Sequence, residues 1–135
     1  MRPSLRFVLA LVASGALAAP VSYVVLRGHA QAETRATAEA LTRGSVAAGR
    51  VAFARYGCGS CHAITGVPGA SGAVGPALDG VAVRTIIAGK LSNAPENMVR
   101  WLRNPQAVVP GNAMPDQDLN EQEARDLAAY LYTLQ

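Results

Sequence analysis

Residues Arg55 to Ile64 read "RYGCGSCHAI" and contain the only two cysteines of the 135-residue chain, Cys58 and Cys61. His62 follows the second cysteine directly. Two thiols at this spacing can close a redox disulfide, supply half of a zinc site or attach a haem covalently. The rest of the chain must discriminate among these uses.

Zinc and disulfide chemistry fit the surrounding sequence poorly. Zinc needs four ligands, or three and a water, and the obvious soft ligands of residues 46–135 are Cys58, Cys61 and His62, whose adjacency hinders a shared tetrahedral ion. A thioredoxin-like pair needs a βαβ setting, and no segment alternates with the period of a strand. A structural disulfide closing so short a loop would add little stability. The Cys-x-x-Cys-His pattern therefore favours a c-type haem attachment site.

The chemistry of that attachment explains each residue of the motif. The thiols of Cys58 and Cys61 would add across the two vinyl groups of the porphyrin and form thioethers. His62 would then project toward the iron as an axial ligand. Gly59 and Ser60 are small enough to let the backbone lie against the edge of the ring.

A second axial ligand has to come from elsewhere in the chain. His29 is the only other histidine and lies outside the predicted domain. Met98 sits in the middle of a predicted helix among apolar neighbours, where core packing is its expected role. Met114 lies in the loop "VVPGNAMPDQ", held between Pro110 and Pro115, and is the predicted sulfur ligand to the iron.

Charge and composition exclude some functions. The formal charge of +3 resides in residues 1–45, because residues 46–135 carry seven basic and seven acidic side chains. No basic stripe with interleaved aromatic residues is present, so nucleic-acid binding has little support. Only 5% of the residues are aromatic, and a small domain so poor in large side chains is expected to need a cofactor to complete its core.

The N-terminal segment predicts export. Residues 7–26 are uncharged, Arg2 and Arg6 precede them and Arg27 follows. Twenty apolar residues are long enough for a membrane helix, and the basic N-terminus would stay in the cytoplasm. A cleaved signal peptide ending near Ala32 is the competing interpretation. We predict an anchor or signal over 1–27, a tether over 28–45 and a folded domain over 46–135.

The folded domain is predicted to be all-α, with three to five short helices joined by long glycine-rich loops and no sheet. Ser45 caps the first helix, which Gly57 ends, and Asn120 and Glu123 form a capping box for the last. The predicted helices cover residues 46–56, 81–88, 95–104 and 121–134, and residues 106–119 are predicted as loop. Loops this long suit a domain wrapped around a large cofactor.

With these elements in place, residues 46–135 resemble the class I cytochromes c. The segment "GRVAFARYGCGSCHAI" is similar to the family's first helix and haem motif, and "GPALDGVAVR" to the loop that follows. The segment "WLRNPQAVVPGNAMP" is similar to the helix and loop that lead to the methionine ligand, and "ARDLAAYLYTL" to the closing helix. Four motifs in order are more specific than the haem motif alone.

The resemblance implies one haem c held by Cys58 and Cys61, with His62 and Met114 as axial ligands. It implies further roles for three residues. The Pro76 carbonyl would accept a hydrogen bond from His62, Arg84 would lie near a haem propionate, and Trp101 would line the pocket. The terminal helices would cross at a glycine, with Gly49 and Phe53 against Leu127 and Tyr130.

A haem with two protein ligands has no open position for substrate, so we expect a one-electron carrier that is not an enzyme. The expected partners are membrane-bound redox complexes on the outer face of a bacterial inner membrane: a quinol-oxidising complex, a terminal oxidase or a dehydrogenase. The alternatives are a fixed haem subunit of such a complex, or a haem peroxidase or gas-binding protein. Lys90 is the domain's only lysine, so a lysine-rich docking rim is absent.

Overall fold

The structure is a computed structural model that describes residues 3–135, without the side chains of residues 3, 4, 6, 10 and 13–18. The chain divides into two compact units, Met1–Thr34 and Arg35–Gln135. Residues 10 and 13–18 of the predicted membrane segment lie outside the described side chains. No helix among the described residues is both long and apolar enough to cross a membrane.

Helix α1 (Pro3–Thr42) runs through most of the segment predicted as a tether. Residues 30–42 include five alanines and two glutamates, and these are strong helix formers. Arg35 and Glu39, one turn apart, form an ion pair with an N···O distance of 3.1 Å. The helix ends where Arg43 adopts a left-handed φ of 56°.

The last turns of α1, from Arg35 to Thr42, belong to the second unit. Thr42 is completely buried, and Arg125 donates a hydrogen bond of 3.2 Å to its carbonyl oxygen. The Ser45 backbone N–H donates to the carboxylate of Asp126 at 2.8 Å. Glu39 accepts from the first backbone N–H of the next helix at 3.0 Å, and this hydrogen bond lowers the pKa of the Glu39 carboxyl. Residues 35–45 are therefore held by side chains of the folded domain.

Helices α2 (Val46–Arg55) and α5 (Glu121–Leu131) form the centre of the domain. Ser45 caps α2, and the capping box of Asn120 and Glu123 starts α5, both as predicted. The two helices cross at Gly49, where a Cβ atom would lie only 1.9 Å from the Asp126 carbonyl oxygen. The predicted crossing at a glycine is confirmed, because no other residue permits this approach.

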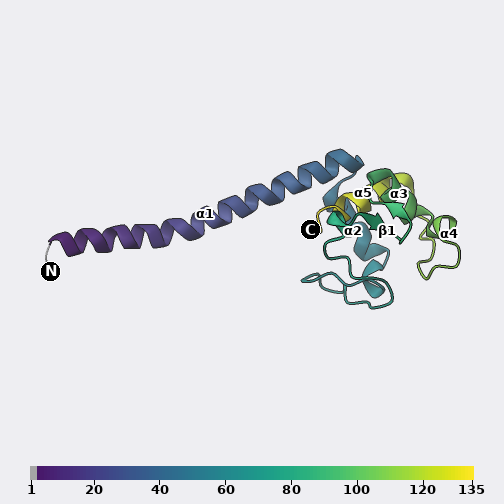
Figure 1. The fold of residues 1–135 in the computed structure, drawn as a ribbon, viewed down its shortest axis with the longest axis horizontal. Coiled ribbons are helices and arrows are strands. Elements are labelled where there is room, and N and C mark those ends of the chain that lie inside the picture. The colour runs from purple at the N-terminus through teal and green to yellow at the C-terminus, as the bar shows by residue number, and fades with distance from the viewer. Residues whose placement is uncertain (1–2) are drawn as a thin grey trace. The chain divides into compact units, whose positions relative to one another are not determined.

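The buried faces of these helices continue into an aromatic and aliphatic core. The rings of Phe53 and Tyr130 meet edge to face, with centroids 5.7 Å apart. Leu127 is 2% exposed and lies within the same core. Helix α3 (Pro95–Arg103) packs beside α5 (Figure 1), beginning at Pro95 and ending before Pro105 as predicted.

Three predictions about the intervening segments were wrong: a helix over 81–88, the absence of a sheet and a loop over 106–119. The helix predicted over 81–88 is a single 3₁₀ turn, η2 (Val81–Val83), followed by strand β1 (Ile86–Ile87), which pairs antiparallel with β2 (Leu91–Ser92). Ala88 and Gly89 both adopt positive φ angles and turn the chain back, and β-branched isoleucines favour the extended form. The loop predicted over 106–119 begins with helix α4 (Pro105–Val108), because proline suits a first helical position.

Candidate haem-binding site

The two cysteines lie on a tight turn that follows α2 directly. Gly57 adopts a left-handed φ of 65° and ends the helix, and Cys58–Ser60 form the 3₁₀ turn η1. The Cys58 carbonyl accepts the backbone N–H groups of Cys61 at 3.2 Å and His62 at 2.9 Å. Both thiols are free and half-buried, and burial raises the pKa of the Cys58 thiol. The turn therefore presents two thiols and an imidazole together.

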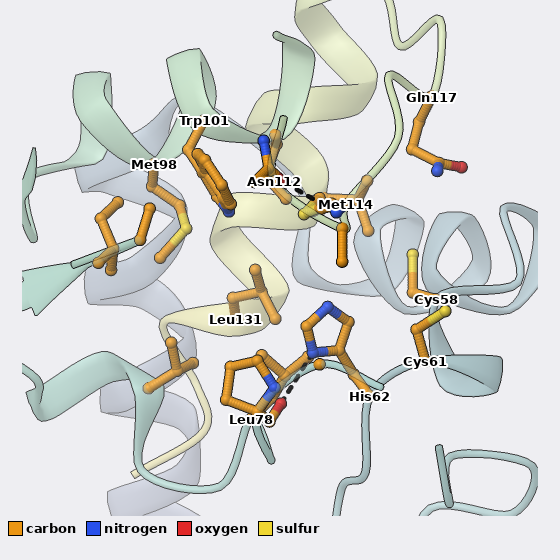
Figure 2. A pocket seen from close by; sticks show the side chains of 18 of the residues that line it. Cys58, Cys61, His62, Leu78, Met98, Trp101, Asn112, Met114, Gln117 and Leu131 are labelled. Carbon is orange, nitrogen blue, oxygen red and sulfur yellow. Dashed lines mark hydrogen bonds between the residues drawn. The ribbon is translucent and has the colours of Figure 1, made fainter. Parts of the chain in front are cut away.

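This turn forms one wall of a cavity of about 620 Å³. Figure 2 shows the His62 ring and the Met114 side chain on opposite sides of the cavity, with Cys58 and Cys61 beside them. Every site residue predicted from the sequence lines this one cavity: Cys58, Cys61, His62, Pro76, Arg84, Trp101 and Met114. Most of the remaining lining is apolar: Phe53, Leu78, Val81, Ile86, Ile87, Met98, Leu102, Leu127 and Leu131.

The imidazole of His62 is oriented by its neighbours in the following loop. Its Nδ1 lies 2.8 Å from the Pro76 carbonyl oxygen. A carbonyl only accepts, so Nδ1 carries the proton and Nε2 keeps a free lone pair for a metal. Gly75 lies so close that a Cβ atom there would sit 2.3 Å from Cε1 of the ring. No larger residue fits beside the ring in this position.

Backbone hydrogen bonds hold that loop against the cysteine turn. The Gly75 N–H donates to the Cys61 carbonyl at 2.8 Å, and the Leu78 N–H donates to the Ala63 carbonyl at 2.8 Å. These bonds set the distance between His62 and the Pro76 carbonyl. A glycine-rich segment with no regular structure is therefore a fixed wall of the cavity.

Arg84, Trp101 and Met98 also line the cavity. Arg84 donates to the carbonyl oxygens of Ala77 at 2.5 Å and Asp79 at 3.1 Å, which bridges the loop after His62 to η2. Trp101 projects from α3 and is half-buried. Met98 is 2% exposed, in agreement with the core role predicted for it.

Two residues that were not predicted from the sequence, Asn112 and Gln106, hold Met114 in place. Asn112 accepts a hydrogen bond from the Met114 backbone N–H at 2.7 Å. Gln106, on α4, donates from Nε2 to the Met114 carbonyl oxygen at 2.7 Å. An asparagine two residues before a functional residue is a recognisable turn signal, so Asn112 was detectable, whereas Gln106 acts through a contact that only the folded chain creates.

The residues around the cavity fit a covalently attached haem. Two free thiols face the cavity beside an imidazole with a free nitrogen, a thioether lies across from them, and the walls are apolar. No group of three or more His, Cys, Asp or Glu side chains in the described part of the chain is placed to hold a metal ion alone. The thiols, imidazole and thioether that line the cavity suit a metal delivered within a porphyrin.

Comparisons with known proteins also support a haem-binding domain. The family model named Cytochrome c matches residues 46–135. The cytochrome c oxidase subunit 2 of Alkalihalophilus pseudofirmus is 40% identical over 87 residues, which are 64% of this chain and 25% of that protein. The subunit of the same name from Bacillus sp. strain PS3 is 37% identical over 81 residues, 57% of this chain and 23% of that protein.

The chain thus spans about a quarter of the length of these curated relatives. No solved structure matches it. The family match covers most of the chain and includes both cysteines, His62 and Met114. The chain therefore belongs to the cytochrome c family and is a monohaem c-type cytochrome of bacterial type.

Proposed function

We propose that this protein transfers single electrons through one haem c, bound covalently by Cys58 and Cys61, with His62 and Met114 as axial ligands. The observation that carries the proposal is the convergence of all seven predicted site residues on one cavity. When bound, the haem supplies an iron that gains and loses one electron. The Pro76 carbonyl orients His62, and the Gln106 and Asn112 side chains hold the Met114 backbone, so the chain would present both ligands to the iron already positioned.

An enzymatic role has less support from the site. Arg84 is the only charged side chain among the described residues that line the cavity, and it is engaged by two backbone carbonyls. The described residues that line the cavity include no aspartate or glutamate to act as an acid or a base. With His62 and Met114 both bound, the iron has no free position for a peroxide or a gas. Electron transfer is the chemistry that remains.

The proposed acceptor of electrons from this protein is a membrane terminal oxidase. The two curated relatives carry the name cytochrome c oxidase subunit 2. This favours a domain that delivers electrons to an oxidase as a fixed subunit over a freely diffusing carrier. A quinol-oxidising complex or a dehydrogenase remains the expected donor. Co-purification from native membranes tests the assignment, and a domain found apart from every oxidase would favour the mobile carrier.

The proposed location is the outer face of a bacterial inner membrane, with the haem domain in the periplasm. The support is the uncharged run of residues 7–26 between arginines, together with the covalent haem attachment proposed at Cys58 and Cys61. Fractionation of native cells tests the location. Intact-mass spectrometry of the same material shows whether residues 1–32 are retained as an anchor or removed near Ala32.

The same mass measurement tests the haem assignment. The protein from its native host should carry the added mass of one haem and no free thiol. The oxidised protein should show the weak band at the red end of the spectrum that sulfur coordination to ferric iron produces. An unshifted mass with two titratable thiols would refute covalent attachment. A haem-bearing protein that lacks the red band and binds carbon monoxide rapidly when reduced would refute Met114 as a ligand.

A further inference from the structure

Met114 is held by an amide clamp, formed by the side chains of Gln106 and Asn112. Both backbone polar groups of Met114 end on this clamp: its N–H donates to Asn112 Oδ1, and its carbonyl accepts from Gln106 Nε2, each at 2.7 Å. Backbone groups outside regular structure bond to other backbone groups, to side chains or to water, and here both groups of one residue bond to side chains. Two side chains that both engage one residue indicate that the position of this residue is controlled.

Every polar atom of the two amides is used. Gln106 Nε2 also donates to the Asn112 carbonyl at 2.9 Å, and its Oε1 accepts the Gly111 N–H at 3.1 Å. Asn112 Nδ2 donates to the carbonyls of Pro105 at 3.0 Å and Val109 at 2.7 Å. The amides therefore tie residues 109–114 to α4, a helix of a single turn that begins at the end of α3.

The two members of the clamp differ in their relation to the cavity. Asn112 lines it, and Figure 2 shows the Asn112 side chain close to Met114. Gln106 is not among the lining residues, so any influence that it has on a bound haem must pass through the methionine loop. A substitution of Gln106 therefore tests how Met114 is positioned without altering a side chain that lines the haem cavity.

We propose that Gln106 is the positioning residue that keeps the Met114 sulfur at the iron, and that its two donated hydrogen bonds set how often the sulfur dissociates. This inference rests on the proposed ligation by Met114. Without the two donors, the carbonyls of Asn112 and Met114 turn to water and the loop gains conformations in which the sulfur points away. A sulfur-off population exposes the iron to external ligands and, because thioether ligation favours ferrous iron, lowers the reduction potential.

The test compares Gln106→Glu with the unaltered holoprotein. Glutamate keeps the volume of the side chain and an acceptor for the Gly111 N–H, but at neutral pH it places a carboxylate against two carbonyls. Imidazole binding to the ferric protein should tighten by about 10- to 100-fold, the change expected for two lost hydrogen bonds of ordinary net strength. The red band should weaken in parallel, and the potential should fall.

Asn97→Ala is the matched control, because Asn97 also donates two hydrogen bonds from one amide, both to Ser92, away from the methionine loop. It should lose stability without any change in imidazole affinity. Equal imidazole affinity in Gln106→Glu and the unaltered protein would overturn the inference. Absence of the red band from the unaltered protein would instead refute ligation by Met114.

A measurement on the unaltered protein applies even if the variant is not recovered with haem. The backbone N–H groups of Gly111 and Met114 are both bonded to the clamp. Their hydrogen exchange should be slowed well below the rate of an unstructured chain. Exchange of both groups at the unstructured rate would show that the clamp does not persist in solution, and the inference would fail.

Discussion

Replacement of Gly49 by alanine should be among the most damaging single changes in this domain. The added Cβ would lie 1.9 Å from the Asp126 carbonyl oxygen and 2.9 Å from Cβ of Tyr130. Heavy atoms settle at about 3.5 Å or more, so α2 and α5 must separate by about 1.5 Å. Neither obstacle is the flexible end of a side chain that can turn aside.

The cost follows from what that separation breaks. Overpacking a core costs typically about 1–3 kcal/mol, and the edge-to-face pair of Phe53 and Tyr130 contributes about 0.5–1.5 kcal/mol beyond its buried area. We expect Gly49→Ala to lower the free energy of unfolding by about 3 kcal/mol. For a domain of this size, such a loss lowers the melting temperature by about 12–24 °C.

Thermal unfolding of the holoprotein, followed by far-ultraviolet circular dichroism, measures this change. Gly28→Ala is the matched control, because a Cβ on Gly28 meets nothing within 4 Å, and alanine is the better helix former. The control should melt no earlier than the unaltered protein. A Gly49→Ala variant that melts within a few degrees of the unaltered protein would show that close approach at Gly49 does not limit the packing of α2 on α5.

Three further outcomes follow from the site and the helix ends. Gly75→Ala should displace the His62 ring, because the new Cβ would lie 2.3 Å from Cε1. Haem-bearing protein should therefore be recovered in lower yield. The ratio of haem absorbance to protein mass measures this yield. Met114→Leu keeps the apolar volume but removes the sulfur, so the red band should vanish and the potential should drop; an unchanged spectrum would exclude this ligand. The hydrogen bond from the Asn120 backbone N–H lowers the pKa of the Glu123 carboxyl from its ordinary value. The stabilisation is therefore present above the ordinary carboxyl pKa and is lost as pH falls through the lowered folded-state pKa. Acid titration of unfolding should show a shallower loss of stability in Glu123→Gln.

Most of the site was accessible from the sequence because its chemistry is local. Cys58, Cys61 and His62 stand within five residues, and a proline-framed loop marks Met114. The capping box at Asn120 is equally local, and the structure contains it. The hairpin at residues 86–92 was missed because two-residue strands are too short to show a period of two. Helix α4 was missed because four residues carry no periodic pattern.

Residue types and short spacings thus sufficed for the helical class and for the prediction of a haem and its donors, because caps, prolines and thiol spacing act within a few residues of the chain. Features that depend on contacts between distant segments were visible only in the tertiary structure. The approach of Gly49 to Asp126, the burial of Thr42 against α5 and the reach of Gln106 to the Met114 carbonyl each join groups that no local pattern pairs. The cavity itself exists only because the cysteine turn, the loop after His62 and the methionine loop close around one volume.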